Sequence, residues 1–536
     1  MPAAAANLTA TTVSCVSHLH FRVGFVAALL FVSAAASAAA PRPNIIFLLA
    51  DDLGYGDIGA YGQKKIRTPN LDQLARDGMR FTDHYSGHNV CAPARCVLMT
   101  GKHPGHAAIR DNRMIAGKGS EGQEPAPAGE LQLPLTLKRL GYTVGGFGKW
   151  GLGPVGSTGD PRQQGFDRFF GYNCQAVAHN YYPTSLWSDD ERVPLNNPPL
   201  PSNNAPFLPN QKLPPGADPT RPETYARFSG NDYAPDLIAG QARQFLRANR
   251  ARPFFLYFPT TVPHLALQVP DDSLAEYAHA FPEEPYIGDR GYLPNRTPRA
   301  AYAGMITRLD REIGRLLALV DELGLRENTI VVFTSDNGPL SNRHGGTDAD
   351  FFNSAGGLRG RKGSYYEGGF RVPCLVRWPG KIAAGTTSER VTGFEDWLPT
   401  FCELVNARDA TPAGIDGISF APTLLGKSQP PRKFLYRESP SYGGQQSVRV
   451  GRWKAIRTNL NPGPAVKERD PHPLALYDLL ADPAEMHNVA AKHPDIVTQL
   501  TTILREQHTK STLWPIRALD ELPDVTATSG LKQTDR

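Results

Sequence analysis

Three short, unbroken runs of apolar residues constrain the fold of this chain most strongly: Asn44–Ala50, Pro253–Phe258 and Thr329–Thr334. Runs that lack a polar–apolar alternation are typical of strands buried on both faces of a parallel sheet. A segment with a one-sided apolar stripe, Tyr302–Leu323, precedes the third run and predicts a helix. The pattern predicts an α/β fold with a mixed, mostly parallel central sheet flanked by helices.

The length of 536 residues exceeds one ordinary domain. We expect a large domain over 41–428, a smaller subdomain over 429–510 and a tail over 511–536. Short strand-like runs and one amphipathic helix near 494–508 predict an α+β subdomain with a short antiparallel sheet. The formal net charge of +5 is small for this length and does not favour nucleic acid as a partner.

The N-terminal 40 residues differ from the rest of the chain. Arg22 precedes the apolar run Val23–Val32, and small residues fill 33–40. This order predicts a secretory signal peptide, cut after about Ala38 or Ala40, and therefore export to the periplasm or the medium. An uncleaved anchor is the alternative, but the run is short for a membrane span, and we expect no stable membrane insertion.

Removal of the signal peptide leaves an odd number of cysteines. They are Cys91, Cys96, Cys174, Cys374 and Cys402. So few cysteines do not make a disulfide scaffold, and an odd count leaves at least one unpaired or chemically special. The sequence does not determine how the last four pair.

Oxygen-bearing side chains follow two of the apolar runs. Asp51 and Asp52 come directly after the first run, and Asp336 and Asn337 follow the third. Ligands of open α/β sheets bind at the carboxyl ends of strands. Four hard oxygen donors favour Ca²⁺, or less strongly Mg²⁺, over zinc. A solvated turn with an N-capping aspartate is the alternative, and it explains one aspartate better than two.

Three basic residues occupy comparable positions. Lys149 follows a strand-like run over 142–148, and His264 follows the Pro253–Phe258 run. Lys362 lies in a glycine-rich segment that could approach an anion. Histidine suits acid–base chemistry near neutral pH. A surface lysine, a structural histidine and a flexible basic loop are the corresponding alternatives.

The sequence Cys91-x-Pro-x-Arg95 lies between a strand-like run over 79–85 and a helix-like run. We interpret Cys91 as part of a loop. A nearby arginine and a helix N-terminus both lower the pKa of a thiol. Taken alone, the five residues favour a structural cysteine.

Together, these residues resemble the sulfatase family, whose members share the alkaline-phosphatase-like fold. The resemblance extends from Asn44 to about His508. It is strongest in five segments: Asn44–Gly54, Cys91–Gly101, Gly148–Gly153, Thr334–Pro339 and Gly360–Pro373. It implies that the chain is a sulfuric ester hydrolase acting on a sulfated small molecule or glycan.

The resemblance also implies a role for each matching residue. Cys91 matches the cysteine that a formylglycine-generating enzyme or an anaerobic maturase converts to Cα-formylglycine (3-oxoalanine). In the family the hydrated aldehyde is the nucleophile. The implied Ca²⁺ ligands are Asp51, Asp52, residue 91, Asp336 and Asn337. The other implied catalytic residues are Arg95, which holds the formylglycine hydroxyl, Lys149 and Lys362, which bind sulfate, and His264, near the leaving oxygen.

One position departs from the family pattern. Many members have Lys-Trp-His where this chain has Lys149-Trp150-Gly151. Four further residues are candidates for substrate binding, and the three histidines among them could replace the missing one: His106, Arg110, His179 and His344. The segments Asp350–Ser354 and Ala178–Pro183 look like those of bacterial carbohydrate sulfatases, which favours a galactose or N-acetylgalactosamine sulfate.

Two other functions are consistent with the sequence. A phosphatase, phosphodiesterase or phosphonate monoester hydrolase could share the fold, and turnover of phosphate over sulfate esters would identify it. A non-catalytic glycan-binding protein could also retain the scaffold. The intact nucleophile, metal and lysine positions argue against that reading.

Overall fold

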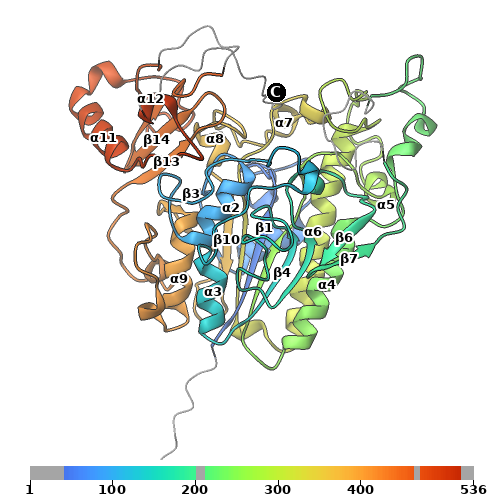
Figure 1. Ribbon diagram of the computed structural model, residues 1–536, viewed down its shortest axis with the longest axis horizontal. Coiled ribbons are helices and arrows are strands. Elements are labelled where there is room, and N and C mark those ends of the chain that lie inside the picture. The colour runs from blue at the N-terminus through green and yellow to red at the C-terminus, as the bar shows by residue number, and fades with distance from the viewer. Residues whose placement is uncertain (1–41, 201–211, 464–470, 521–536) are drawn as a thin grey trace, which may run out of the picture. The chain divides into compact units, whose positions relative to one another are not determined.

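The computed structural model describes residues 42–200, 212–463 and 471–520 (Figure 1). The signal peptide predicted for 1–40 and the last part of the tail lie outside the described residues. Within the described ranges, no helix is both long and apolar enough to cross a membrane. The boundaries expected at 428 and 510 stay predictions.

A single mixed sheet of ten strands forms the centre of the protein. Its strands are β1 Asn44–Ala50, β2 Met79–Phe81, β4 Thr143–Lys149, β5 Arg168–Tyr172, β6 Ser185–Ser188, β7 Glu191–Pro194, β8 Phe254–Pro259, β9 Thr329–Ser335, β10 Cys374–Arg377 and β11 Thr386–Ser388. They lie in the order β11-β2-β10-β9-β1-β8-β4-β5-β6-β7. The inner strands β9, β1, β8, β4 and β5 are parallel, and β10, β6 and β7 pair antiparallel. The predicted mixed, mostly parallel sheet is confirmed.

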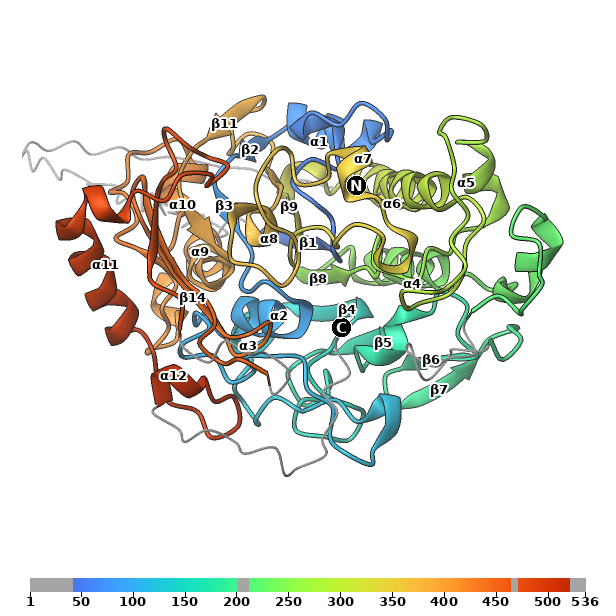
Figure 2. The ribbon, with the colours of Figure 1, turned by 90° about the horizontal axis from the view of Figure 1, so that it is seen from above.

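The position of β1 in the middle of the sheet, with a core on each face, explains why its sequence is apolar throughout. Successive side chains of a strand point to opposite faces. Ile46 and Leu48 join one core with helices α4 (Ala234–Asn249) and α6 (Pro298–Glu322). Ile45 and Phe47 join another core with helices α2 (Cys91–Thr100), α3 (Gln132–Arg139) and α9 (Trp397–Leu404). Figure 2 shows the two helical layers on either side of the sheet.

The predicted helices are present with small shifts at their ends. The helix expected over Tyr302–Leu323 is α6, which begins earlier because Pro298 starts its first turn, a position proline favours. The remaining α-helices of this part are α1 Pro69–Arg76, α5 Asp271–Ala275, α7 Ala349–Phe352, α8 Glu367–Phe370 and α10 Ala421–Leu424.

Two local predictions were wrong. The segment 166–233 is rich in proline, asparagine and aromatic residues and has a weak periodicity, which predicts mostly loop, but it contains β5, β6 and β7. Strands β6 and β7 are only four residues each and lie at the sheet edge, where partial exposure removes a clear apolar pattern. The single strand expected over 79–85 is two strands, β2 and β3 (His84–Tyr85), and β3 pairs with β12 (Thr392–Gly393) instead of the central sheet.

The C-terminal part has its own small core. Strands β13 (Leu435–Ser439), β14 (Gln445–Val450), β15 (Trp453–Arg457) and β16 (Ala475–Asp478) form an antiparallel sheet in sequence order. Leu500 and Leu504 of α11 (Pro494–Glu506) pack against it. The predicted short antiparallel sheet with one helix is confirmed, and a further short helix, α12 (Arg517–Asp520), follows.

Candidate active site

The ends of four parallel strands bring the predicted site residues together. In register, β1 pairs with β8 and β9, and β8 pairs with β4, so these strands end at one edge of the sheet. Asp51 follows β1, Asp336 follows β9, and Lys149 is the last residue of β4. His264 lies in the turn after β8. The predicted meeting of these side chains at a shared edge is confirmed.

Asp51 is surrounded by basic groups. The Nζ atom of Lys149 lies 2.6 Å from its Oδ2, and the guanidinium of Arg95 lies 3.4 Å from the same oxygen. All three side chains are completely buried. Burial alone would raise the pKa of Asp51, but the charges of Lys149 and Arg95 hold it below its usual value. Asp51 is therefore a permanent carboxylate.

Asp52 has a left-handed backbone with φ of 64°. This turn aims its carboxylate at Lys362, whose Nζ lies 2.8 Å from Oδ1. The amide of Asn337 donates to the same oxygen at 2.6 Å. Burial raises the pKa of Asp52, although Lys362 opposes the shift. The site thus contains one carboxylate that is stabilised by its surroundings and a second that is much less so.

Arg95 connects the third carboxylate to β4. Its Nε and a terminal nitrogen donate to Asp336 at 3.1 and 2.8 Å, and its other terminal nitrogen donates to the Lys149 carbonyl. Burial, together with the negative charge of Asp51, raises the pKa of Asp336 to about 6 despite this pairing. Arg95 therefore orders two carboxylates and a strand end.

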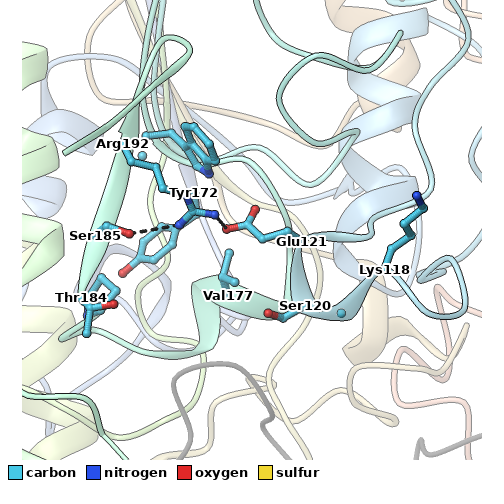
Figure 3. Close-up of a pocket in the computed structure, with 12 residues that line it drawn as sticks. Lys118, Ser120, Glu121, Tyr172, Val177, Thr184, Ser185 and Arg192 are labelled. Carbon is cyan, nitrogen blue, oxygen red and sulfur yellow. Dashed lines mark hydrogen bonds and ion pairs between the residues drawn. The ribbon is translucent and has the colours of Figure 1, made fainter. Parts of the chain in front are cut away.

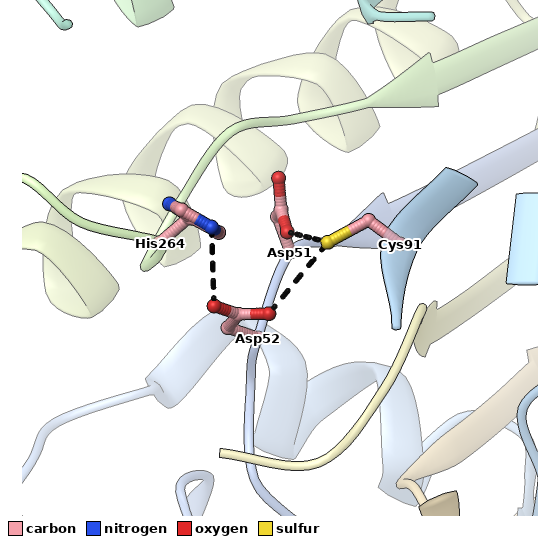
Figure 4. A group of neighbouring side chains, drawn as sticks. All are labelled: Asp51, Asp52, Cys91 and His264. Atoms are coloured by element: carbon pink, nitrogen blue, oxygen red, sulfur yellow. Dashed lines mark hydrogen bonds and ion pairs between the residues drawn. The ribbon is translucent and has the colours of Figure 1, made fainter. Parts of the chain in front are cut away.

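Cys91 is the first residue of α2 and is completely buried, so the interpretation as a loop residue was wrong. Its Sγ lies 3.3 Å from Asp51 Oδ1 and 3.9 Å from Asp52 Oδ1 (Figure 4). The Nζ atom of Lys362 lies 3.4 Å from the same sulfur. Burial and the adjacent carboxylates raise the pKa of the thiol well above its usual value. The expected lowering by Arg95 is absent because Asp51 and Asp336 neutralise that arginine.

His264 faces Asp52 across 3.5 Å, measured from Nε2 to Oδ2 (Figure 4). Its Nδ1 lies 2.7 Å from the carbonyl of Leu265. Burial and the charge of Lys362 lower its pKa well below the usual value, so the ring is neutral. We assign the proton to Nδ1 because that nitrogen faces an acceptor, which leaves a lone pair on Nε2 towards the site.

Two of the four substrate-binding candidates lie beside this cluster. His179 stacks on His264 with ring centroids 4.2 Å apart, and neither of its nitrogens has a hydrogen-bond partner among the described residues. The ring of His344 lies 5.3 Å from that of Tyr292, which also contacts His264. Burial lowers the pKa values of His179 and His344.

The other two candidates contact different parts of the chain. His106 pairs with Asp416 at 2.9 Å. Arg110 pairs with Glu438 at 3.1 Å and donates to the Thr509 carbonyl at 2.7 Å. These contacts tie the segment after α2 to more C-terminal parts of the chain. A role in substrate binding stays a prediction for both residues.

The oxygen atoms of the cluster fit a hard divalent cation. Asp51, Asp52 and Asp336 supply carboxylates, and Asn337 Oδ1 is buried without a hydrogen-bond partner among the described residues. Lys149, Lys362 and Arg95 already balance the three negative charges, so repulsion between the carboxylates is not the argument for a metal. Two other observations favour a cation. Asn337 Oδ1 lacks a partner that a cation would supply, and a cation would lower the raised pKa values of Asp52 and Asp336.

The remaining cysteines, Cys96, Cys174, Cys374 and Cys402, are buried free thiols. One residue that positions His264 had no signal in the sequence. The hydroxyl of Tyr181 lies 2.5 Å from the Thr261 carbonyl and 2.6 Å from the His264 carbonyl, and so fixes the turn that carries His264. From the sequence alone, the aromatic residues of 178–187 predict only packing within a loop or contact with a sugar ring.

Comparison with known families agrees with this geometry. Residues 43–407 match the sulfatase family. The chain belongs to the sulfatase family. Residues 361–510 of this sulfatase also match the C-terminal region of N-sulphoglucosamine sulphohydrolase. The protein is therefore a sulfuric ester hydrolase, and its fold is the alkaline-phosphatase-like fold of that family.

Known sulfatases align with most of the chain. Human arylsulfatase A is 34% identical over 510 residues, which cover 89% of this chain and 90% of the relative. The N-acetylgalactosamine-6-O-sulfatase of Bacteroides thetaiotaomicron is 30% identical over 521 residues, covering 88% and 94%. The crystal structure of Ps i-CgsB in complex with k-i-k-neocarrahexaose superposes with a TM-score of 0.69 at 25% identity, covering 90% of this chain and 98% of the other.

Proposed function

We propose that this sulfatase removes a sulfate ester from a carbohydrate, with galactose or N-acetylgalactosamine sulfate as the favoured unit. The observation that carries the proposal is the position of Cys91, whose Sγ lies within 4 Å of Asp51, Asp52 and Lys362 at the helix start. A relative named for N-acetylgalactosamine-6-sulfate and a structural neighbour bound to a neocarrahexaose support the choice of sugar.

We infer that residue 91 acts as Cα-formylglycine and not as a thiol. The raised pKa of Cys91 keeps the thiol protonated and therefore weakly nucleophilic. A Cα-formylglycine there would supply, in its hydrated form, one hydroxyl as nucleophile and a second whose deprotonation restores the aldehyde as sulfate leaves. Because Cys91 is fully buried in α2, the maturing enzyme must reach it before the chain folds.

Asp51, Asp52, Asp336 and Asn337 would hold the cation, for which Ca²⁺ fits these ligands better than Mg²⁺. Ca²⁺ accepts flexible arrangements of carboxylate and amide oxygens, whereas Mg²⁺ demands near-octahedral geometry and retains water. Such a cation would acidify the nucleophilic hydroxyl and polarise a sulfate oxygen.

The lysines and His264 carry out the remaining tasks. Lys362 lies 3.4 Å from the sulfur of Cys91, and Lys149 contacts Asp51 on the other side. Both can stabilise negative charge that develops on the sulfate oxygens. The lone pair on His264 Nε2 can take up a proton as the nucleophile forms and return it to the leaving alcohol oxygen. Gly151 provides no side chain for this step.

The proposal also includes export by the signal peptide, because only residues 1–40 combine a basic start, an apolar run and small residues. Modification by a formylglycine-generating enzyme or an anaerobic maturase would then precede or accompany export.

A screen of sulfated mono- and disaccharides, with released sulfate as the readout, tests the function. The matured protein should hydrolyse 4-nitrophenyl sulfate and at least one galactose or N-acetylgalactosamine sulfate. Faster turnover of 4-nitrophenyl phosphate than of the sulfate would instead indicate a phosphatase or phosphonate hydrolase. Full activity of a Cys91→Ala variant would exclude the proposed nucleophile.

A further inference from the structure

A pocket of about 390 Å³ lies at the edge of the central sheet next to the catalytic strands (Figure 3). It is lined by residues from three segments of the chain: Lys118–Glu121, Gly171 to Val177, and Pro183 to Arg192. Tyr172, which lines the pocket, is the register partner of Lys149 in the β4–β5 pair. The pocket is therefore next to the strand that supplies a catalytic lysine.

One short segment borders both the pocket and the catalytic cluster. The 3₁₀ turn η3 (Ala176–His179) follows β5. Val177 of this turn lines the pocket, and His179 at its end stacks on His264. A ligand that extends from the catalytic centre along this segment would reach the pocket.

Residues 173–179, which follow β5 and include η3, carry polar side chains that lack partners. Asn173 is 0% exposed, and neither its amide nitrogen nor its oxygen has a hydrogen-bond partner among the described residues. The same holds for Oε1 of Gln175, which is 7% exposed, and for both nitrogens of His179. None of these three side chains lines the pocket itself. Buried polar groups are normally paired, so three unpaired ones within seven residues indicate that a polar ligand binds along this segment, between the catalytic cluster and the pocket.

The pocket itself combines apolar faces with fixed polar groups. Arg192 stacks on Trp187 at 4.3 Å and donates to Glu121 at 3.0 Å and to Ser185 at 3.2 Å (Figure 3). These contacts hold a guanidinium and a carboxylate in place beside the ring. Thr184 adds a hydroxyl. A sugar offers the matching chemistry, with an apolar C–H face and several hydroxyls.

We propose that this pocket is a second carbohydrate subsite, which holds a sugar residue of the same glycan beyond the sugar whose sulfate ester lies at residue 91. The inference rests on the proposed function and extends it, because it makes the preferred substrate an oligosaccharide and not a monosaccharide. Lys118 at the pocket suits a sugar that carries its own negative charge.

Binding to a Cys91→Ala variant tests the subsite without turnover. The ligands are tetrasaccharides of chondroitin 6-sulfate and of κ-carrageenan, measured by calorimetry. In this background, the Thr184→Trp substitution is designed to fill the pocket with an indole ring. Thr184 lines the pocket and is exposed. Thr498→Trp, exposed on α11, is the matched control.

We expect at least one tetrasaccharide to bind, Thr184→Trp to weaken it by about tenfold or more, and the control to leave it unchanged. Unchanged affinity in Thr184→Trp, or binding of neither tetrasaccharide, would overturn the subsite. Hydrolysis of 4-nitrophenyl sulfate by the wild-type protein is measured separately. Its failure would contradict the proposed function, whereas the binding result judges the subsite alone.

Discussion

Replacement of Lys149 by methionine removes one charge from the centre of the site while retaining most of the side-chain volume. Lys149 Nζ is 2.6 Å from Asp51 Oδ2, and both side chains are fully buried. Loss of one partner of a buried ion pair costs about 3–5 kcal/mol of unfolding free energy. We expect the lower end, because Arg95 still lies 3.4 Å from the same oxygen.

The same substitution should affect catalysis. Removal of one group that stabilises developing negative charge typically lowers kcat by about 10²–10³. We therefore expect Lys149→Met to lose about 3 kcal/mol in urea unfolding and about a hundredfold or more in kcat on 4-nitrophenyl sulfate.

A second lysine provides a matched control. Lys102 pairs with Glu130 at the same 2.6 Å, but these side chains are 26% and 27% exposed. Partly exposed pairs contribute about 0–1 kcal/mol, so Lys102→Met should change stability little and kcat not at all. If Lys149→Met resembled Lys102→Met in both measurements, the reasoning about the buried site would be refuted.

Three further predictions concern the metal, pH and the substrate. Chelation should abolish activity and lower the Tm, and Ca²⁺ should restore both, since Ca²⁺ at about 100 times its Kd adds about 2.7 kcal/mol; a chelator-insensitive Tm would contradict the metal site. Burial raises the pKa of Asp57 to about 7, so the folded state retains a proton that the unfolded chain releases, and stability falls as pH rises from about 4 to 7. Asp57→Asn should remove roughly 4 kcal/mol of this decline at most, and an unchanged pH slope in urea unfolding would argue against it. Finally, the ratio of kcat/KM for 4-nitrophenyl sulfate to that for the phosphate should exceed one, and the reverse ratio would contradict a sulfatase specificity.

Much of the site could be predicted from the sequence because its residues follow strands of a parallel sheet. Carboxyl ends of parallel strands meet at one edge, so Asp51, Lys149 and Asp336 could be grouped from their positions after apolar runs. The β5–β7 region could not be predicted in the same way. Its short edge strands are partly exposed and therefore lack a buried pattern.

Which charges pair depends on tertiary structure. Lys149 and Asp51 are 98 residues apart in the chain, and Arg95 and Asp336 are 241 apart. The sequence therefore indicated a basic environment for Cys91, but could not show that two carboxylates neutralise Arg95. Burial and the adjacent carboxylates instead raise the pKa of the thiol, against the expected direction. Likewise, contacts of His106 and Arg110 with distant acidic residues had no local signal.

The state of residue 91 tests the central claim most directly. Trypsin should release residues 81–95 as one peptide, since it cleaves after Arg80 and after Arg95. Mass spectrometry of that peptide from active protein should show an aldehyde in place of the Cys91 thiol, and the aldehyde fraction should rise in proportion to sulfate released per mole of protein. Fully active protein with only a thiol at residue 91 would contradict the account.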